Sequence, residues 1–340
     1  SGVHYGELLE ATRDHLERHH RRSPWQSFLR RVLIEKVFPH PTLMKLALLP
    51  ARLLQRAEAE HLLPKFARDA LALLPQNVTE GHLPEISPAL GRSRGRVGFI
   101  RGCVMNVMFG RTNENTIRIL NRAGYDVITP RTQGCCGALH AHGGNLTAAR
   151  AAARLNLGAF DCATLDAIII NAAGCGSTLK EYAHLLPDEP RAVVFSSKVK
   201  DLSEFLVAAG FQSALTAQAP GIKVTFHDAC HLAHAQRITH PPRVLVKAIA
   251  GANYVEMPES DVCCGSAGSY NLTEPDMAER LQGRKVENIL RTGARCVITT
   301  NPGCLLQMRA GLDRAGAGHI ATLHIADFLA DNLASPAPPG

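Results

Sequence analysis

Short apolar runs alternate with longer amphipathic stretches through most of the chain. The run at residues 97–100 is followed by a helix-like stretch at 116–123, and an Ala-rich stretch at 145–160 precedes the run at 167–170. Short apolar runs of this kind are typical of buried strands, and their alternation with helices indicates parallel-sheet units. Further strands are expected at 125–129, 224–226, 254–256 and 296–299. The pattern therefore predicts an α/β fold.

The second part of the chain repeats the first. Four cysteines of each part keep their spacing to within two residues, at offsets of 127, 128, 128 and 129: Cys103 with Cys230, Cys135 with Cys263, Cys136 with Cys264, and Cys175 with Cys304. A glycine follows each Cys-Cys pair, and a glycine precedes each last cysteine. The closing segments also match, 192–195 and 202–206 with 320–323 and 325–329. We therefore expect two duplicated α/β units.

Four regions follow from this repeat. Residues 1–95 form a helical extension and linker, 96–215 the first cysteine-rich unit, 220–333 the second, and 334–340 a disordered tail. Within the extension, leucines interrupted by Pro41, Pro50 and Pro64 predict short helices, and residues 87–96 have the composition of a linker.

Composition and charge narrow the class of protein. Of 340 residues, 46% are hydrophobic and 20% charged, which is typical of a globular chain. No apolar run is long enough to cross a bilayer, and no export signal opens the sequence, so we expect a cytoplasmic protein. The net charge of +7 arises between Arg13 and Arg56, where ten basic residues face three acidic ones. This segment predicts an acidic partner or the inner membrane surface, and no nucleic acid.

The cysteines predict metal binding. Two pairs among the ten cysteines are adjacent residues, which suit a disulfide poorly. In a reducing cytoplasm, metal or redox chemistry is the better interpretation. Each predicted group follows the carboxyl ends of strands, where open α/β sheets place their binding sites. The candidate ligands are Cys103, Cys135, Cys136 and Cys175 in the first unit, and Cys230, Cys263, Cys264 and Cys304 in the second.

Thiolates are the natural ligands of iron–sulfur clusters, and four complete a Cys₄ site. Gly137 and Gly265 permit the sharp turn that adjacent ligands need, and their N–H groups are candidate donors to cluster sulfur. The alternative is a Cys₄ zinc site in one or both halves, although neither half has two C-x₂-C knuckles. No catalytic residue is assigned.

Several residues near the ligands are candidates for supporting roles. His227, Asp228 and His231 surround Cys230, and each imidazole is suited to bonding sulfur, carrying a proton or ligating metal. His140 and His142 follow the first Cys-Cys-Gly. The two remaining cysteines, Cys162 and Cys296, are expected to be packing residues: Cys162 has no partner in the repeat, and Cys296 matches Ala167 inside a strand.

These motifs resemble the CCG cysteine-rich domain family, over residues 96–333. The family includes one of the subunits of heterodisulfide reductase, one of those of anaerobic glycerol-3-phosphate dehydrogenase, a lactate-utilisation protein and the iron–sulfur subunits of glycolate oxidases. Residues 171–177, 300–304 and the opening residues 1–8 are most similar to the last group. In that group residues 1–8 follow a ferredoxin-like domain, so the resemblance implies that this chain lacks such a domain.

The resemblance implies an electron-relay subunit that is not catalytic alone. A flavin-containing subunit would oxidise glycolate to glyoxylate, and this chain would carry electrons through 4Fe-4S-type clusters towards a membrane quinone. In the full family motif, cysteines stand where this chain has Ala172 and Asn301, so each half offers four thiolates rather than five. A four-ligand cluster and zinc therefore both remain open. The other functions considered are a heterodisulfide-reductase-like activity, a lactate or glycerol-3-phosphate dehydrogenase subunit, and a zinc-stabilised scaffold.

Overall fold

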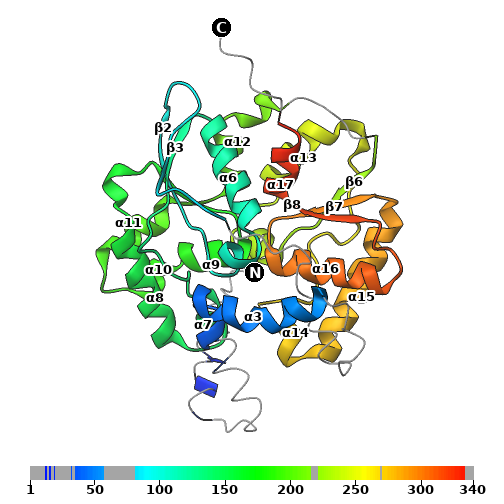
Figure 1. The fold of residues 1–340 in the computed structure, drawn as a ribbon, viewed down its shortest axis with the longest axis horizontal. Coiled ribbons are helices and arrows are strands. Elements are labelled where there is room, and N and C mark those ends of the chain that lie inside the picture. Colours follow the sequence, from blue (N-terminus) through cyan, green and yellow to red (C-terminus); the bar gives the residue numbers. More distant parts are fainter. Residues whose placement is uncertain are drawn as a thin grey trace.

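The computed structural model describes residues 12–13, 15–16, 19, 32, 35–56, 81–215, 221–268 and 270–333. Two α/β units lie side by side, each with a parallel sheet and flanking helices (Figure 1). Pro64, the tail at 334–340 and Arg21, Arg22, Arg30 and Arg31 of the basic segment lie outside the described residues.

The first sheet has five strands in the order β1-β3-β2-β4-β5. All neighbours are parallel except the antiparallel edge pair of β1 and β3. The strands are β1 (Ile86–Ser87), β2 (Gly95–Phe99), β3 (Tyr125–Ile128), β4 (Ala167–Ile170) and β5 (Val199–Asp201). The stretch 87–96, read from sequence as a linker, thus runs from the edge strand of this sheet into its centre.

The second sheet repeats the first with fewer strands. Its order is β6-β7-β8, all parallel, and Tyr254 forms a single parallel bridge to Val224 on the other side of β6. The expected strand at 254–256 is therefore reduced to that bridge. The strands are β6 (Val224–Phe226), β7 (Cys296–Thr299) and β8 (Ala321–His324).

Register shows that the two sheets are equivalent. Val97 pairs with Ala167 in the first sheet, and Val224 pairs with Cys296 in the second. These pairs are related by the offsets of 127 and 129 found in the sequence. The prediction of an α/β fold with two repeated parallel-sheet units is confirmed.

Helices cover the faces of both sheets. The extension and first half contain α3 (Pro41–Arg56), α5 (Val104–Met108), α6 (Gly110–Arg122), α7 (Ala138–His142), α8 (Leu146–Ala159), α9 (Ala173–Lys180), α10 (Tyr182–Leu185), α11 (Pro190–Lys198) and α12 (Leu202–Ala208). The second half contains α13 (His240–Ala250), α14 (Tyr270–Thr273), α15 (Pro275–Thr292), α16 (Pro302–Arg314) and α17 (Ile325–Asp331). Short 3₁₀ turns lie at Cys162–Thr164, Phe211–Ala214 and Gly251–Asn253, and a π-helical turn, η5, at His231–Ala235.

One pairing of the repeat was wrong. The run 192–195 was matched with 320–323, most of which lies in β8. The run 192–195 instead lies inside helix α11, and the strand equivalent to β8 is β5. Ala192 and Phe195 are fully buried, whereas Val193 and Val194 are 59% and 48% exposed. Burial at positions i and i+3 is the pattern of a helix, and Pro190 is well suited to begin one.

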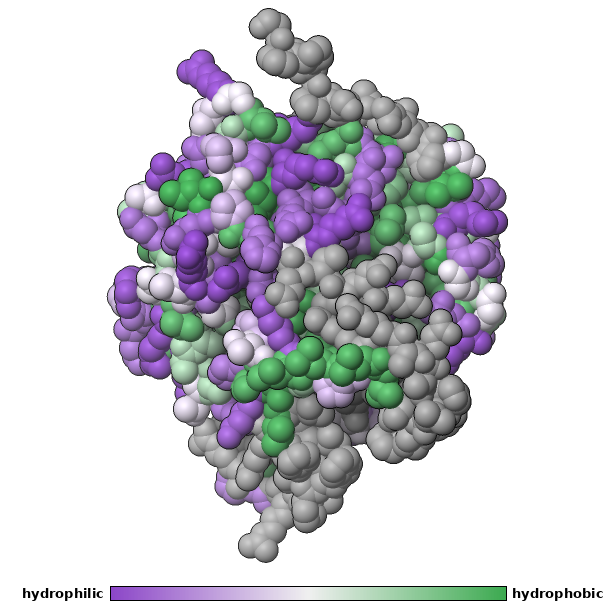
Figure 2. All heavy atoms as spheres, in the orientation of Figure 1, coloured by the Kyte–Doolittle hydropathy of each residue, from purple (hydrophilic) through white to green (hydrophobic). Residues whose placement is uncertain are grey.

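Helix α3 joins the extension to the first half. It begins at Pro41 and continues through Pro50, so the expectation of short helices broken at Pro50 is wrong for this segment. Met44 is buried in the core of the first half. Other leucines on α3 are exposed, and Figure 2 shows an apolar band along this helix. The exposed leucines are Leu43, Leu46, Leu49 and Leu53.

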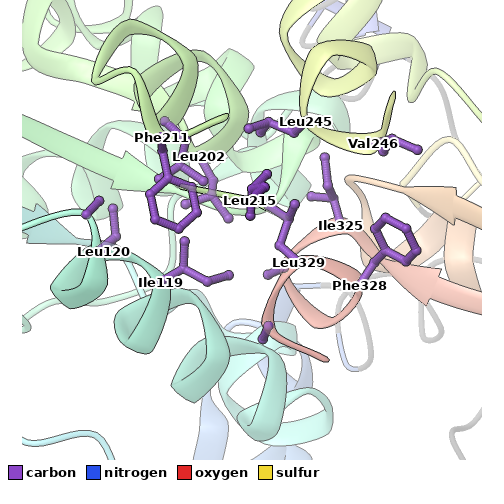
Figure 3. Close-up of a cluster of buried hydrophobic side chains, with 14 of the residues drawn as sticks. Ile119, Leu120, Leu202, Phe211, Leu215, Leu245, Val246, Ile325, Phe328 and Leu329 are labelled. Carbon is purple, nitrogen blue, oxygen red and sulfur yellow. The ribbon is translucent and has the colours of Figure 1, made fainter. Parts of the chain in front are cut away.

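The two halves share one hydrophobic core. Helix α17, which ends the second half, packs against α6 of the first half, and α12, which ends the first half, packs against α13 of the second. These pairings are reciprocal, so the halves meet about a pseudo-twofold axis. Figure 3 shows side chains from all four helices converging there: Ile119 and Leu120, Leu202, Leu245 and Val246, and Phe328 and Leu329. Within the described residues, no helix is sufficiently long and apolar to cross a bilayer.

Candidate metal centres

The cysteines of each half lie beyond the carboxyl ends of the strands of its sheet. In the first half, Cys103 lies between β2 and α5, the Cys135-Cys136 pair follows β3, and Cys175 lies in the first turn of α9 after β4. In the second half, Cys230 follows β6, and Cys304 lies in the first turn of α16 after β7. Strand ends of a parallel sheet share one edge, so residues distant in sequence converge.

The first group brings its four thiols into one chain of contacts. The sulfurs of Cys103 and Cys135 are 3.6 Å apart. The pKa of Cys136 is raised by its interactions with Cys135 and Cys175, so these thiols also lie close together. All ten cysteines of the protein are free thiols. The structure thus places the four predicted ligands of the first half together.

The second group repeats this order of contacts. The pKa of Cys230 is raised by its interaction with Cys263, and that of Cys264 by its interactions with Cys263 and Cys304, so these thiols lie close together. The imidazole of His227 belongs to the same cluster. One of its ring nitrogens and the sulfurs of Cys264 and Cys304 all lie within 4.8 Å of one another. Identical connectivity in the two halves indicates a duplicated site.

Hydrogen bonds between neighbouring thiols separate their pKa values. In the first group, hydrogen bonds from Cys103 and Cys136 hold the pKa of Cys135 well below its usual value, and Cys103 and Cys136 are raised in return. In the second group, the bond from Cys264 lowers the pKa of Cys304 to about 5. Thiolates are the metal-binding form of cysteine, and the lowered pKa values of Cys135 and Cys304 favour that form.

The glycine after each cysteine pair has the same structure in both halves. Gly137 and Gly265 have φ angles of 85° and 91°, a conformation that residues with a Cβ rarely adopt. Their N–H groups donate to the sulfurs of Cys135 at 3.4 Å and Cys263 at 3.3 Å. A Cβ at Gly265 would collide with the carbonyl oxygen of Ala278.

Asp228 and His231, two candidates for supporting roles in the second half, differ from each other in their contacts. The carboxylate of Asp228 is bound by Arg243 at 2.8 and 2.6 Å and accepts a hydrogen bond from Ser260 at 2.7 Å. It therefore anchors the segment before Cys230. The Nδ1 atom of His231 lies 3.6 Å from the sulfur of Cys230.

His231 also connects the two halves. Its ring stands 4.8 Å from that of His142, which follows the first Cys-Cys-Gly. His140 is buried, and its charge contributes to lowering the pKa of Cys135. Histidines of the first half therefore lie near both cysteine groups.

Sequence reasoning missed the buried polar residues that hold the cysteine turns. Asn156 donates to the carbonyl oxygen of Cys135 at 2.9 Å, and the hydroxyl of Tyr182 donates to that of Cys136 at 2.8 Å. At the repeat position of Asn156, Lys285 donates to the carbonyl oxygens of Glu259 at 2.6 Å and Ser260 at 3.2 Å. A polar residue on the buried face of an amphipathic helix was the available signal.

Cys162 and Cys296 lie in settings unlike those of the other eight. Burial alone raises the pKa of Cys296, to about 12, and its side chain belongs to the shared core. Cys162 is half-buried. Burial raises its pKa, Lys198 lowers it and Asp161 raises it. Neither pKa is shifted by another thiol.

Comparison with known proteins agrees with the duplicated site. The model of the cysteine-rich domain CCG matches residues 97–180 and 224–309. The chain belongs to the CCG cysteine-rich domain family. The two matched segments contain all eight cysteines of the two groups, which is the pairing that the sequence repeat predicted.

Several relatives of this CCG protein are iron–sulfur subunits by name. It is 39% identical to a probable glycolate oxidase iron-sulfur subunit of Bacillus subtilis, covering 97% of this chain and 78% of the relative. It is 32% identical to the glycolate oxidase iron-sulfur subunit of Escherichia coli, covering 95% and 76%. One subunit of the fumarate reductase (CoM/CoB) of Methanothermobacter marburgensis is 33% identical over 71% of this chain and 47% of the relative.

A crystal structure of a hypothetical protein from Helicobacter pylori has the same fold. Its TM-score is 0.55 at 12% identity, covering 97% of this chain and 58% of that one. The likeness supports the arrangement of the sheets and helices.

The residues of both groups fit an iron–sulfur group. Each provides four clustered thiols, all buried or half-buried, and a glycine N–H directed at sulfur. Soft thiolates with hydrogen bonds to sulfur are the ligands that such clusters use. In this CCG protein the ligands would be the eight cysteines of the two groups.

Proposed function

We propose that this protein is the iron–sulfur electron-transfer subunit of a glycolate oxidase complex. It would receive electrons from a flavin-containing subunit that oxidises glycolate to glyoxylate and deliver them towards a quinone. The observation that carries the proposal is the pair of four-thiol groups, in a chain similar to glycolate oxidase iron–sulfur subunits over 97% of its length. The alternative partners, lactate and glycerol-3-phosphate oxidising subunits, are distinguished by the experiment below.

The division of labour follows from the chemistry of the site. A bound 4Fe-4S-type group would supply one-electron transfer. The protein would contribute the thiolate ligands, the sharp glycine turns and the N–H donors. Oxidation of glycolate would then belong to the flavin partner, and this subunit would not be catalytic alone. A zinc ion in one half is the remaining alternative for that site.

The closeness of the two groups supports a common task. The N–H of Ala173 donates to the carbonyl oxygen of Thr300 at 3.2 Å, and the amide of Gln236 donates to the carbonyl oxygen of Ala173 at 2.9 Å. These bonds join α9, which carries Cys175, to the second half. Figure 1 shows α9 and α16 near the centre of the molecule, between the two sheets. Electron transfer between centres benefits from such proximity.

We further propose a cytoplasmic protein that touches the inner membrane face near the quinone. The support is the basic segment from Arg13 to Arg56 and the exposed leucines of α3. Basic residues near an anionic surface contribute about 1 kcal/mol each. The units 96–215 and 220–333 would each hold one centre.

The test is substrate-driven reduction of the protein in complex with its flavin partner. Under anaerobic conditions, glycolate should bleach the iron–sulfur absorption near 400 nm, whereas lactate and glycerol 3-phosphate should not. The matched control is the same complex with Cys136→Ser and Cys264→Ser. Bleaching by lactate alone would move the protein to the lactate-oxidising branch, and no bleaching by any donor would contradict an electron-transfer role.

A further inference from the structure

His227 is a buried imidazole whose ring nitrogens have no conventional hydrogen-bond partner in the part of the chain that the structure describes. It directly follows β6, and its own N–H donates to the carbonyl oxygen of Ile298 at 2.8 Å, which fixes the backbone. The residue is 0% exposed. Within the described residues, neither Nδ1 nor Nε2 has a partner with conventional hydrogen-bond geometry, although the ring interacts with the thiol of Cys304. An unpaired buried polar group destabilises the folded state, so an isolated imidazole at this position requires an explanation.

The ring is directed into the second cysteine group. One of its nitrogens and the sulfurs of Cys264 and Cys304 all lie within 4.8 Å of one another. The imidazole also contributes, after Cys264, to lowering the pKa of Cys304. Neighbouring Asp228 does not orient the ring through a hydrogen bond, because its carboxylate is bound by Arg243 and Ser260.

The first half has no equivalent imidazole. The offset of 127 that relates Cys103 to Cys230 places Ile100 at the position of His227. Ile100 is also 0% exposed, so the same pocket holds an apolar side chain in one half and a nitrogen donor in the other. The presence of Ile100 in the first half indicates that an apolar side chain is sufficient to fill this position. Packing alone therefore does not account for the imidazole of His227.

We propose that His227 is a ligand, through a ring nitrogen, of the metal held by Cys264 and Cys304. The first centre is then bound by sulfur alone, and the second by sulfur and nitrogen. Neutral imidazole ligation raises the reduction potential of an iron–sulfur centre, and mixed sulfur and nitrogen sets also suit zinc. This inference rests on the proposal that the two cysteine groups hold metal.

X-ray absorption of the anaerobically purified full chain tests the inference directly. Spectra at the iron and zinc edges report the ligand atoms of whichever metal is bound. We expect nitrogen among the coordinating atoms, at about 2.0–2.1 Å for zinc. For paramagnetic iron, protein labelled with ¹⁵N-histidine should show a strong nitrogen coupling in pulsed electron paramagnetic resonance. Bound metal with sulfur ligands alone would overturn the inference and leave the proposed function intact.

Three variants assign the nitrogen. His227→Ile reproduces the first half and should remove the nitrogen signal, while the first centre keeps its metal. His231→Ala removes the competing imidazole beside Cys230 and should retain the signal, as should His234→Ala, whose side chain is 60% exposed. Should His227→Ile fail to fold, loss of the signal in His231→Ala would still overturn the assignment. A wild-type protein without metal would contradict the proposed function as well.

Discussion

The Oδ1 atom of Asn301 accepts a hydrogen bond of 3.2 Å from the N–H of Gly174, which directly precedes Cys175. The Nδ2 atom of the same side chain lies 3.6 Å from the sulfur of Cys304. The bond to Gly174 fixes the orientation of the amide, because the opposite flip would set two donors against each other. One side chain therefore spans from the first cysteine group to the second.

This relationship makes the two centres unequal. Asn301 and Ala172 occupy the same repeat position, each as the extended residue before a helix, but Ala172 has no donor. Hydrogen bonds to ligand sulfur raise the reduction potential of an iron–sulfur centre. The second centre therefore receives a stabilising donor that the first does not.

Asn301→Ala should lower the reduction potential of the second centre. Loss of one donor is expected to change the one-electron equilibrium about tenfold, or about 59 mV. Redox titration monitored by electron paramagnetic resonance measures it. Asn301→Asp should lower the potential at least as far, because it keeps the acceptor for Gly174 but sets a negative oxygen beside sulfur. Asn332→Ala is the control, since its side-chain amide donates to the carbonyl oxygen of Phe328 in α17. An unchanged potential in both Asn301 variants would refute this role.

Serine at the paired cysteines should remove metal from one half. Cys263→Ser or Cys264→Ser is expected to lose most of the metal of the second centre, because a hydroxyl is a poor replacement for a soft thiolate. Cys162→Ser should leave metal content unchanged, since burial, Lys198 and Asp161 shift the pKa of Cys162 and no other thiol does. Elemental analysis together with circular dichroism measures both. Equal loss from all three variants would show general unfolding instead of ligation.

Asp201→Asn should abolish a pH dependence of stability. Burial raises the pKa of Asp201 from 3.8 to about 6, against hydrogen bonds from Ser203; Lys180 lowers the pKa and Glu204 raises it. Between pH 4 and 6 the folded state then binds more protons than the unfolded state, so the free energy of unfolding falls as pH rises. The fall is on the order of 3 kcal/mol.

Urea unfolding of the Asp201→Asn variant and wild type at pH 4, 5, 6 and 7 measures this effect. In the wild type, the carboxylate of Asp201 accepts a hydrogen bond of 2.8 Å from the N–H of Ser203 at the start of α12. The side-chain oxygen of asparagine provides an acceptor for the same bond. The variant should therefore match the wild type near pH 4 and exceed it near pH 7. A constant difference across the range would mean that Asp201 is ionised normally in the folded protein.

Leu329→Ala should destabilise both halves together. Leu329 is 0% exposed in α17, within the core that the two halves share. Truncation of a buried leucine costs about 2–5 kcal/mol. Because the core is continuous, we expect a single unfolding transition at lower denaturant. Leu290→Ala, at a 44% exposed position of α15, is the matched control and should change stability little. Two separate transitions would show that the halves fold independently.

The sequence predicted what the repeat and the apolar pattern encode. The strands at 167–170 and 296–299 were correct to the residue, because both are continuous buried runs between turns, apolar except for Thr299. The cysteine groups followed, since the ends of parallel strands share one edge. The run 192–195 failed because four apolar residues fit a strand and a helix equally well, and only the exposure of Val193 and Val194 separates the two.

The residues around the cysteines were harder to predict. The contact of Asn301 with Gly174, and that of Lys285 with Glu259 and Ser260, join segments distant in the chain. The position of Lys285 on the buried face of an amphipathic helix was a signal, but nothing in the local sequence identifies the groups that Asn301 and Lys285 bind. His227 was recognised only as a neighbour of Cys230; its burial and its direction towards Cys264 and Cys304 depend on the packing of the whole second half.

The most direct test of the central claim is a count of iron, sulfide and zinc in the anaerobically purified protein, with an electron paramagnetic resonance spectrum of the reduced sample. We predict a brown protein with absorption near 400 nm, about four irons and four sulfides in the first centre, and a reduced-cluster signal that disappears in Cys136→Ser. Colourless protein that contains zinc and no iron in either half would contradict an electron-transfer subunit and leave a zinc-stabilised scaffold.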